Sequence, residues 1–145
     1  MGKSLLDLAV RLDKMQGKLT KAASDLAASV ALGLVEELAD VTPVDTSKAI
    51  SNWQVGIVAP VASEREAYYI GSKGSTEDIS EDATVINARR ILKSKKPGQI
   101  IYVSNTAKYI RDLDGGSSLQ EPAGFVHRAC ENARNVVKRS KLELK

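Results

Sequence analysis

Apolar residues recur every three or four positions from Leu5 to Leu38, which predicts one long amphipathic helix. Gly17 is the weak point of this pattern, because glycine costs about 1 kcal/mol relative to alanine inside a helix. A continuous helix of this length would far exceed the three or four turns usual in globular proteins. Either Gly17 divides it into two helices, or part of the apolar stripe packs on another subunit. The stripe consists of Leu5, Leu8, Leu12, Met15, Leu19, Ala22, Leu26, Val30, Leu34 and Leu38.

The segment after this helix reads as a tight connection followed by a strand. Pro43 disfavours the helical conformation for Thr42, so the helix should end there. Asp45 is well placed to cap a short helical turn that follows. Alternate residues from Trp53 onward are apolar, which predicts a strand over residues 53–58 with its apolar side toward the core.

Weaker signals organise the rest of the chain. Residues 67–70 have strand composition, and residues 71–80 are rich in glycine and polar residues, which predicts a mobile loop. A helix is expected over residues 80–95, a strand over 100–103, and a last helix with Pro122 at its first position. The expected fold class is α+β: a long N-terminal helix packed on a small, mainly antiparallel sheet, with a further helix and a C-terminal helix. Residues 1–17 form a helical arm or an extension of the long helix, and residues 18–145 a single domain.

Composition narrows the function classes. The chain has 145 residues, 43% of them hydrophobic and 27% charged, which is ordinary for one globular domain. No apolar run approaches the roughly 20 residues that a membrane span needs, and no signal peptide is evident, so neither a membrane partner nor secretion is expected. With one cysteine and one histidine, the chain has no disulfide framework and no multi-cysteine or histidine-rich metal centre. A lone thiol fits a reducing cytosol best.

Charge is distributed unevenly along the chain. The formal net charge is −1 over residues 1–40, −4 over residues 41–88 and +8 over residues 89–145. Five cations fall within eight residues and could contact a polyanion, an acidic protein surface or only solvent. No aromatic residues alternate with them, so stacking on single-stranded nucleic acid is not supported. This basic cluster consists of Arg89, Arg90, Lys93, Lys95 and Lys96.

Three groups of residues could carry chemistry, and each has a simpler explanation. His127 and Cys130 are three residues apart on the expected last helix and could form a thiol–imidazole dyad, although Cys130 also suits a small buried position. Asp45 and the two hydroxyl residues after it are explained by a capped turn. The glycine-rich segment 71–75 lacks the spacing of a phosphate-binding loop. The residues therefore suggest no catalytic function, cofactor or metal.

Two segments together resemble one known family. The first is Thr42-Pro43-Val44-Asp45-Thr46-Ser47, followed by Asn52-Trp53. The second runs from the strand at Ile101 through Asn105 and Tyr109 to Leu113-Asp114-Gly115-Gly116-Ser117-Ser118 and then Gln120-Glu121-Pro122-Ala123-Gly124-Phe125-Val126. In order and spacing these segments resemble the tail-completion or neck proteins of tailed bacteriophages, in the group of tail components similar to the lambda minor tail protein Z. Ser47 stands where that family usually has glycine.

The resemblance implies a virion structural protein at the head–tail junction that is not an enzyme and is assembled in the host cytoplasm. Such a neck, tail-completion or tail-terminator protein would form a six- or twelve-fold ring of its own copies. It would bind the phage connector, head-closure or tail proteins close to the packaged DNA. The motif residues would then be structural: Pro43, Asp45, Trp53, Asn105, Tyr109, Gly116 and Pro122. The basic cluster would face a neighbouring subunit or DNA. A small basic nucleic-acid-binding protein is the alternative.

Overall fold

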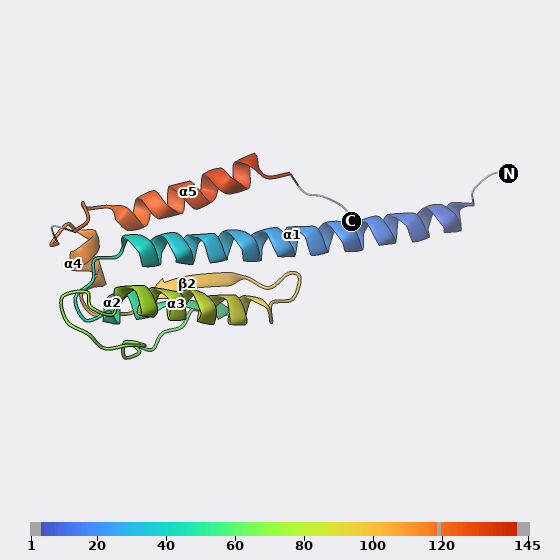
Figure 1. Ribbon diagram of the computed structural model, residues 1–145. Coiled ribbons are helices and arrows are strands. Elements are labelled where there is room, and N and C mark those ends of the chain that lie inside the picture. Colours follow the sequence, from blue (N-terminus) through green and yellow to red (C-terminus); the bar gives the residue numbers. More distant parts are fainter. Residues whose placement is uncertain (1–3, 119, 142–145) are drawn as a thin grey trace.

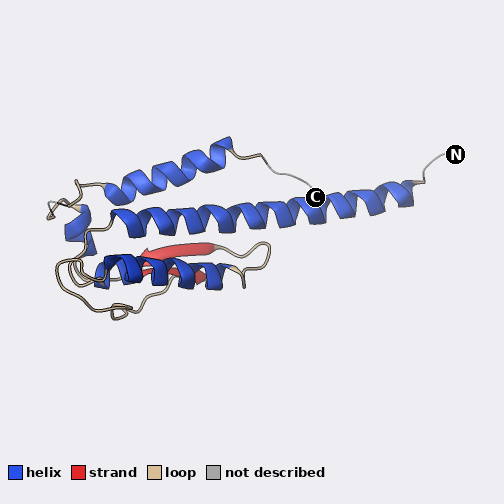
Figure 2. Ribbon diagram, viewed as in Figure 1, coloured by secondary structure: helices blue, strands red, loops and turns tan. Residues whose placement is uncertain are grey.

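The computed structural model describes residues 4–118 and 120–141. Its fold class is α+β, as the sequence predicts (Figures 1 and 2). The elements follow one another as α1 (Leu5–Val41), α2 (Lys48–Ser51), β1 (Trp53–Ile57), α3 (Glu77–Leu92), β2 (Ile101–Asn105), α4 (Ile110–Asp114) and α5 (Phe125–Arg139).

Helix α1 is one uninterrupted helix of 37 residues, which corresponds to about 55 Å. Its N-terminus carries a capping box: the Asp7 N–H donates to Ser4 Oγ at 3.1 Å, and the Ser4 N–H donates to the Asp7 carboxylate at 3.3 Å. Gly17 does not break the helix, so the first of the two expected alternatives is wrong. A side chain at Gly17 would meet no atom within 4 Å, so this glycine lies on open surface.

The elements form three layers with α1 in the middle (Figure 1). On one side, Ala31 and Val35 of α1 pack with Val55 of β1 and with Ala88 and Leu92 of α3. On another side, Leu38 packs with Trp53, Phe125 and Ala129, which brings α5 against the helix. Because two layers cover different sides of α1, the C-terminal half of this helix is the centre of the fold.

The sheet consists of β1 and β2, paired antiparallel, with Trp53 opposite Asn105 and Ile57 opposite Ile101. Trp53 and Val55 are buried and Ile57 is partly buried, so the apolar side predicted for this strand does face the core. Gly56 permits the following turn to fold back, since a Cβ there would lie 2.1 Å from the Ala59 carbonyl oxygen.

The structure corrects several boundaries. Residues 67–70 form no strand, because side chains satisfy their backbone: Tyr68 N–H donates to Ser51 Oγ at 3.0 Å, and Tyr69 C=O accepts from Thr76 Oγ1 at 2.6 Å. Residues 77–80 belong to α3 rather than to a loop, and this helix ends at Leu92 instead of about residue 95. The connection after β2 contains the short helix α4.

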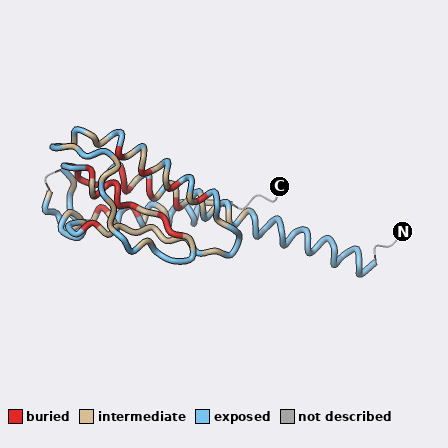
Figure 3. The backbone as a smooth tube through the Cα atoms, turned by 90° about the horizontal axis from the view of Figure 1, so that it is seen from below, coloured by how far each residue is buried: buried red, intermediate tan, exposed pale blue. Residues whose placement is uncertain are grey.

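The N-terminal part of α1 projects beyond the three layers (Figures 1 and 3). Residues 4–21 are all exposed, and Ala22 is the first partly buried residue of the helix. We refer to residues 5–21 as the arm and to the remainder of the described chain as the body. The arm ends four residues later than the 1–17 segment expected from the sequence; residues 1–3 of that segment lie outside the described residues.

Candidate assembly surfaces

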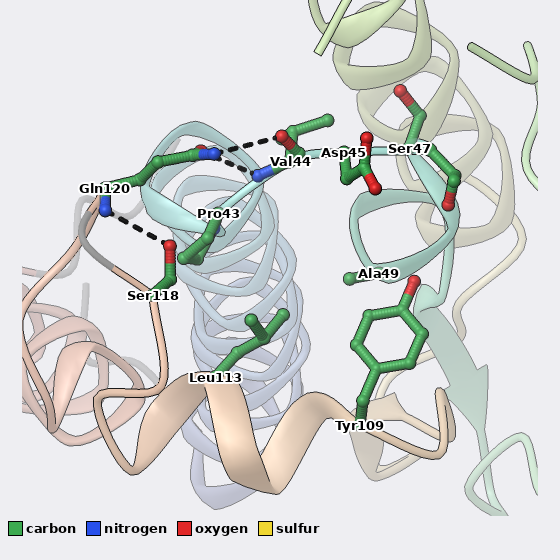
Figure 4. Close-up of a pocket in the computed structure, with 10 residues that line it drawn as sticks. Pro43, Val44, Asp45, Ser47, Ala49, Tyr109, Leu113, Ser118 and Gln120 are labelled. Carbon is green, nitrogen blue, oxygen red and sulfur yellow. Dashed lines mark hydrogen bonds between the residues drawn. The ribbon is translucent and has the colours of Figure 1, made fainter. Parts of the chain in front are cut away.

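The two motif segments line one cavity of about 330 Å³ (Figure 4). One wall comes from the connection between α1 and α2 together with Ala49 of α2, and the other from Tyr109 just before α4, from α4 itself and from the chain that follows it. These walls are at least sixty residues apart in the sequence, so the fold alone brings them together. The lining residues are Pro43, Val44, Asp45, Thr46, Ser47, Ala49, Tyr109, Leu113, Ser118 and Gln120.

Gln120 joins the two walls through its side-chain amide. Its Oε1 accepts from the Val44 N–H at 2.9 Å, and its Nε2 donates to the Val44 carbonyl at 3.1 Å (Figure 4). The side-chain amide therefore bonds to Val44 as a neighbouring strand would, and it satisfies both the N–H and the C=O of Val44. The Gln120 N–H in turn donates to Ser118 Oγ at 3.1 Å. Gln120 belongs to the second motif segment, but nothing in its local sequence indicates this bridging role.

Asp45 holds the loop around Lys73 and does not cap the helical turn that follows it. Its carboxylate accepts from the Lys73 N–H at 2.6 Å, and its carbonyl accepts from the Gly74 N–H at 2.9 Å. The N-cap of α2 is Ser47, at φ 68°, and no side chain caps that helix, so the predicted capping role of Asp45 is wrong. The left-handed conformation of Ser47 is one that glycine adopts at no cost, which explains why glycine suits this position.

Trp53 connects the sheet to α1, as the sequence predicts. The side chain is 6% exposed, and its Nε1 donates to Thr42 Oγ1 at 2.8 Å. Thr42 Oγ1 itself donates to the Leu38 carbonyl at 2.5 Å, so the end of α1 is fixed through two hydrogen bonds. On the facing strand, Asn105 Nδ2 donates to the Ala49 carbonyl at 2.8 Å. These motif residues therefore hold the framework around the cavity.

The remaining motif residues, Tyr109, Gly116 and Pro122, lie in the segment between β2 and α5. Tyr109 lies at the cavity with its side chain partly exposed, and Gly116 adopts φ 90°, where a Cβ would lie 3.1 Å from the Ala123 Cβ. Pro122 is not the first residue of the last helix, which begins at Phe125. The helix start is set instead by Asp114, whose carboxylate accepts from the Val126 N–H at 3.0 Å. Proline alone could not reveal this cap, because Asp114 lies twelve residues away in the sequence.

Helix α3 separates charge between its two ends. Glu77 and Asp78 occupy its first turn and Arg89 and Arg90 its last turn, an arrangement that complements the helix dipole. Over 16 residues these ends lie about 24 Å apart. The acidic end includes Glu77, Asp78, Glu81 and Asp82, and the basic end includes the whole basic cluster.

Some residues at the basic end of α3 contact other side chains of the same chain, and others do not. Arg89 Nη2 lies 3.9 Å from Glu36 Oε1, and Lys95 Nζ donates to Ser24 Oγ at 2.7 Å, so both residues partly serve the contact with α1. Arg90 donates to Asn87 Oδ1 at 2.6 Å on the same helix. Lys93 and Lys96 are exposed and have no salt-bridge partner among the described residues. These two lysines are the ones most available to a partner.

The acidic end lacks neutralisation within the described chain. Partial burial raises the pKa of Glu81 above its usual range, and the carboxylates of Asp40, Asp82, Glu77 and Asp78 raise it further. This anionic patch is complementary in charge to a basic surface on a neighbouring molecule.

His127 and Cys130, which could have formed a thiol–imidazole dyad, are not assembled into a site. Cys130 is exposed, so the expectation that it is a buried apolar residue is wrong. His127 is exposed as well, and no hydrogen bond joins the two side chains. Among the described residues, no three histidine, cysteine or acidic side chains are placed to hold a metal ion. No described helix is both long and apolar enough to cross a membrane.

The arm presents apolar side chains that the body does not cover. Five of them are between 47% and 86% exposed, and they lie on the stripe predicted from the sequence: Leu5, Leu8, Leu12, Met15 and Leu19. We refer to these five residues as the arm stripe. Exposed apolar surface of this extent is typical of an interaction site.

No protein-family model matches this chain, and no curated protein or solved structure matches it either.

Proposed function

We propose that this chain is a virion structural protein of the phage head–tail junction, acting in the neck, in tail completion or as a tail terminator. It forms a six- or twelve-fold ring of its own copies that joins the connector or head-closure proteins to the tail. The observation that carries this proposal is the arm stripe, because a protein that works as a monomer rarely keeps such surface in water. The proposal includes no catalytic residue, metal or cofactor.

The motif residues support this proposal through the kind of role they have. Trp53 and Asn105 bond to backbone and hydroxyl groups of the framework, and Asp45 and Gln120 each tie together segments far apart in the sequence. Within the part of the chain that the structure describes, none of these four residues contacts a cluster of nucleophiles and bases. Residues that specify a rigid building block are what an assembly subunit requires.

The charge separation on α3 supports a head-to-tail ring. A cyclic ring uses two different surfaces of each subunit, so the acidic end of one α3 can face Lys93 and Lys96 of the next subunit. A channel densely lined with cations would also retain passing DNA, which a conduit should avoid. We therefore assign the basic cluster to the contact between subunits rather than to DNA.

Native mass spectrometry and negative-stain electron microscopy of the purified full chain test the proposal. We expect closed rings of six or twelve copies, together with binding to isolated phage connectors or tails. The alternative is a small basic nucleic-acid-binding protein. A monomer that binds double-stranded DNA tightly, with affinity falling steeply as salt rises, would favour that alternative and contradict the ring.

A further inference from the structure

The arm stripe follows a stricter repeat than an ordinary amphipathic helix. Its apolar residues alternate in steps of three and four, and Ala22 and Leu26 continue the same alternation. This is the spacing of the a and d positions of a heptad repeat, with Leu5, Leu12, Leu19 and Leu26 at a and Leu8, Met15 and Ala22 at d. A repeat of 3.5 residues is the one that keeps a seam facing a second helix along its whole length.

The repeat coincides with the arm. The next a and d positions after Leu26 hold Ser29, Gly33 and Glu36, so the apolar repeat ends at Leu26, shortly after the body begins. The body buries a different side of α1: Ala31, Val35 and Ala39 lie about 150° around the helix from the arm stripe. The stripe is therefore not a continuation of the face that packs on the sheet and α3.

The arm stripe leads into a surface that a helix already covers. After Leu26 the apolar positions recur every four residues and so turn gradually around the helix to Leu34 and Leu38, which pack in the cluster containing Phe125 and Ala129 of α5. Helix α5 covers only that half, and the arm extends beyond it (Figure 1). Because a helix already packs where these apolar positions continue, the uncovered arm stripe is best suited to contact another helix.

Charges beside the seam favour identical helices in parallel. The g positions of the arm are Arg11 and Lys18, whereas its e positions are Ala9, Gln16 and Ala23. In a parallel pair each g residue faces an e residue, so Arg11 faces Gln16 and Lys18 faces Ala23. In an antiparallel pair with fully overlapping arms, g faces g, and Arg11 would oppose Lys18 twice. The sequence thus penalises the antiparallel arrangement and leaves the parallel one free of like-charge contacts.

We propose that the arms of two or more copies of this chain associate as a parallel, in-register coiled coil through the arm stripe. Gly17 occupies an f position, which points away from the seam, and this placement explains how a glycine is tolerated there. A helix that lacks contacts with its own body gains from this pairing the packing that isolated helices of this length need in water. The arrangement is compatible with a cyclic ring, because all arms then leave the ring in the same direction.

Leu12→Glu and Val10→Glu in the full chain form a matched pair of variants. Both positions are about half exposed, at 55% and 47%, so neither change should disturb the body. Leu12 is in the seam, whereas Val10 occupies an f position. Leu12→Glu should weaken self-association roughly 100-fold, because it places unpaired carboxylates in an apolar seam, and Val10→Glu should change it little. Analytical ultracentrifugation over a concentration series measures both.

Disulfide formation tests the orientation. In a Cys130→Ser background, Leu8→Cys should form an interchain disulfide under mild oxidation, because parallel in-register helices place identical d residues side by side. Val10→Cys, on the outer side, should form far less. Equal cross-linking of the two variants, or unchanged association of Leu12→Glu, would overturn the coiled coil. Rings that persist in that case would leave the head–tail proposal standing. Arm-dependent dimers or trimers that never close into rings would support the coiled coil and contradict the ring.

Discussion

The side-chain amide of Gln120 hydrogen-bonds to both the N–H and the C=O of Val44, across 76 positions of the sequence. This pairing joins the chain that precedes α5 to the connection that follows α1. It closes one side of the cavity that the two motif segments line, and it fixes how these two segments meet.

Gln120→Glu should lower the stability of the fold by about 1–2 kcal/mol, because the new carboxylate loses the donor to the Val44 carbonyl and faces that carbonyl instead. Thermal unfolding followed by circular dichroism measures the effect. Gln99→Glu is the matched control, since Gln99 Oε1 only accepts from the Lys96 N–H at 2.7 Å and a carboxylate can do the same. Equal melting temperatures for the two variants would contradict the assigned role.

Trp53→Ala should cost about 3–5 kcal/mol of folding free energy, because it opens a cavity between the sheet, α1 and α5 and leaves Thr42 without its donor. Trp53→Phe keeps most of the packing but loses the hydrogen bond, so it should cost much less. Chemical denaturation measures both values. A Trp53→Ala protein with unchanged stability would show that the indole side chain of Trp53 does not anchor the core.

Asp45→Ala should expose the segment around Lys73 to trypsin, because the carboxylate holds the Lys73 N–H. The loss of this single hydrogen bond should lower the folding free energy by only about 1 kcal/mol. Limited proteolysis with mass spectrometry identifies the cleavage site. Thr46→Ala is a neighbouring control with no side-chain hydrogen bond within the described residues, and it should leave cleavage at Lys73 unchanged. Equal cleavage in the two variants would mean that Asp45 does not restrain the loop.

Glu81→Gln should raise the melting temperature at pH 7, and the gain should shrink as the pH falls through the raised pKa of Glu81 and be lost once the pH is below about 4.5. The pKa of Glu81 is raised in the folded chain above its ordinary value of 4.5. Between those two values the folded chain holds more protons than the unfolded one, so the Glu81 carboxyl lowers stability as the pH rises through this window. Asp13→Asn, in the exposed arm, is the control and should show no such trend. A gain that does not change with pH would contradict this electrostatic origin.

Lys93→Glu combined with Lys96→Glu should impair ring formation, since these lysines are expected to meet the acidic end of α3 in the next subunit. Adding Glu77→Lys and Asp78→Lys should restore it, because the two surfaces then exchange signs. Lys138→Glu with Lys141→Glu makes the same charge change near the end of α5 and serves as the control. Sedimentation velocity reads the result. In phage particles, normal assembly with failed DNA ejection after reversal of Lys93, Lys95 and Lys96 would instead place the basic cluster on the DNA path.

The sequence by itself determined the elements whose patterns are local. The alternation at Trp53 and Val55 predicted a strand with the correct buried side, because periodicity reports which face meets the core. The apolar period of α1 predicted the helix but only part of its buried side, since Ala31, Val35 and Ala39 lie outside the predicted stripe. The strict three–four alternation of the arm stripe was also visible in the sequence. What the sequence lacked was the information that the body covers only the later half of that helix.

Tertiary structure alone decided the contacts between distant segments. The Asp45 carboxylate could accept a hydrogen bond from a helix N-terminus or from a loop. It accepts from the Lys73 N–H because the fold places that loop beside it. Asp114, and not Pro122, fixes the start of α5, because a carboxylate twelve residues away reaches the Val126 N–H. At residues 67–70 a strand was expected, but the Tyr68 N–H and the Tyr69 C=O bond to hydroxyl groups of Ser51 and Thr76 and not to a neighbouring strand. A polar group bonds to whichever partner the fold brings near, and that proximity is not encoded in any short stretch of sequence.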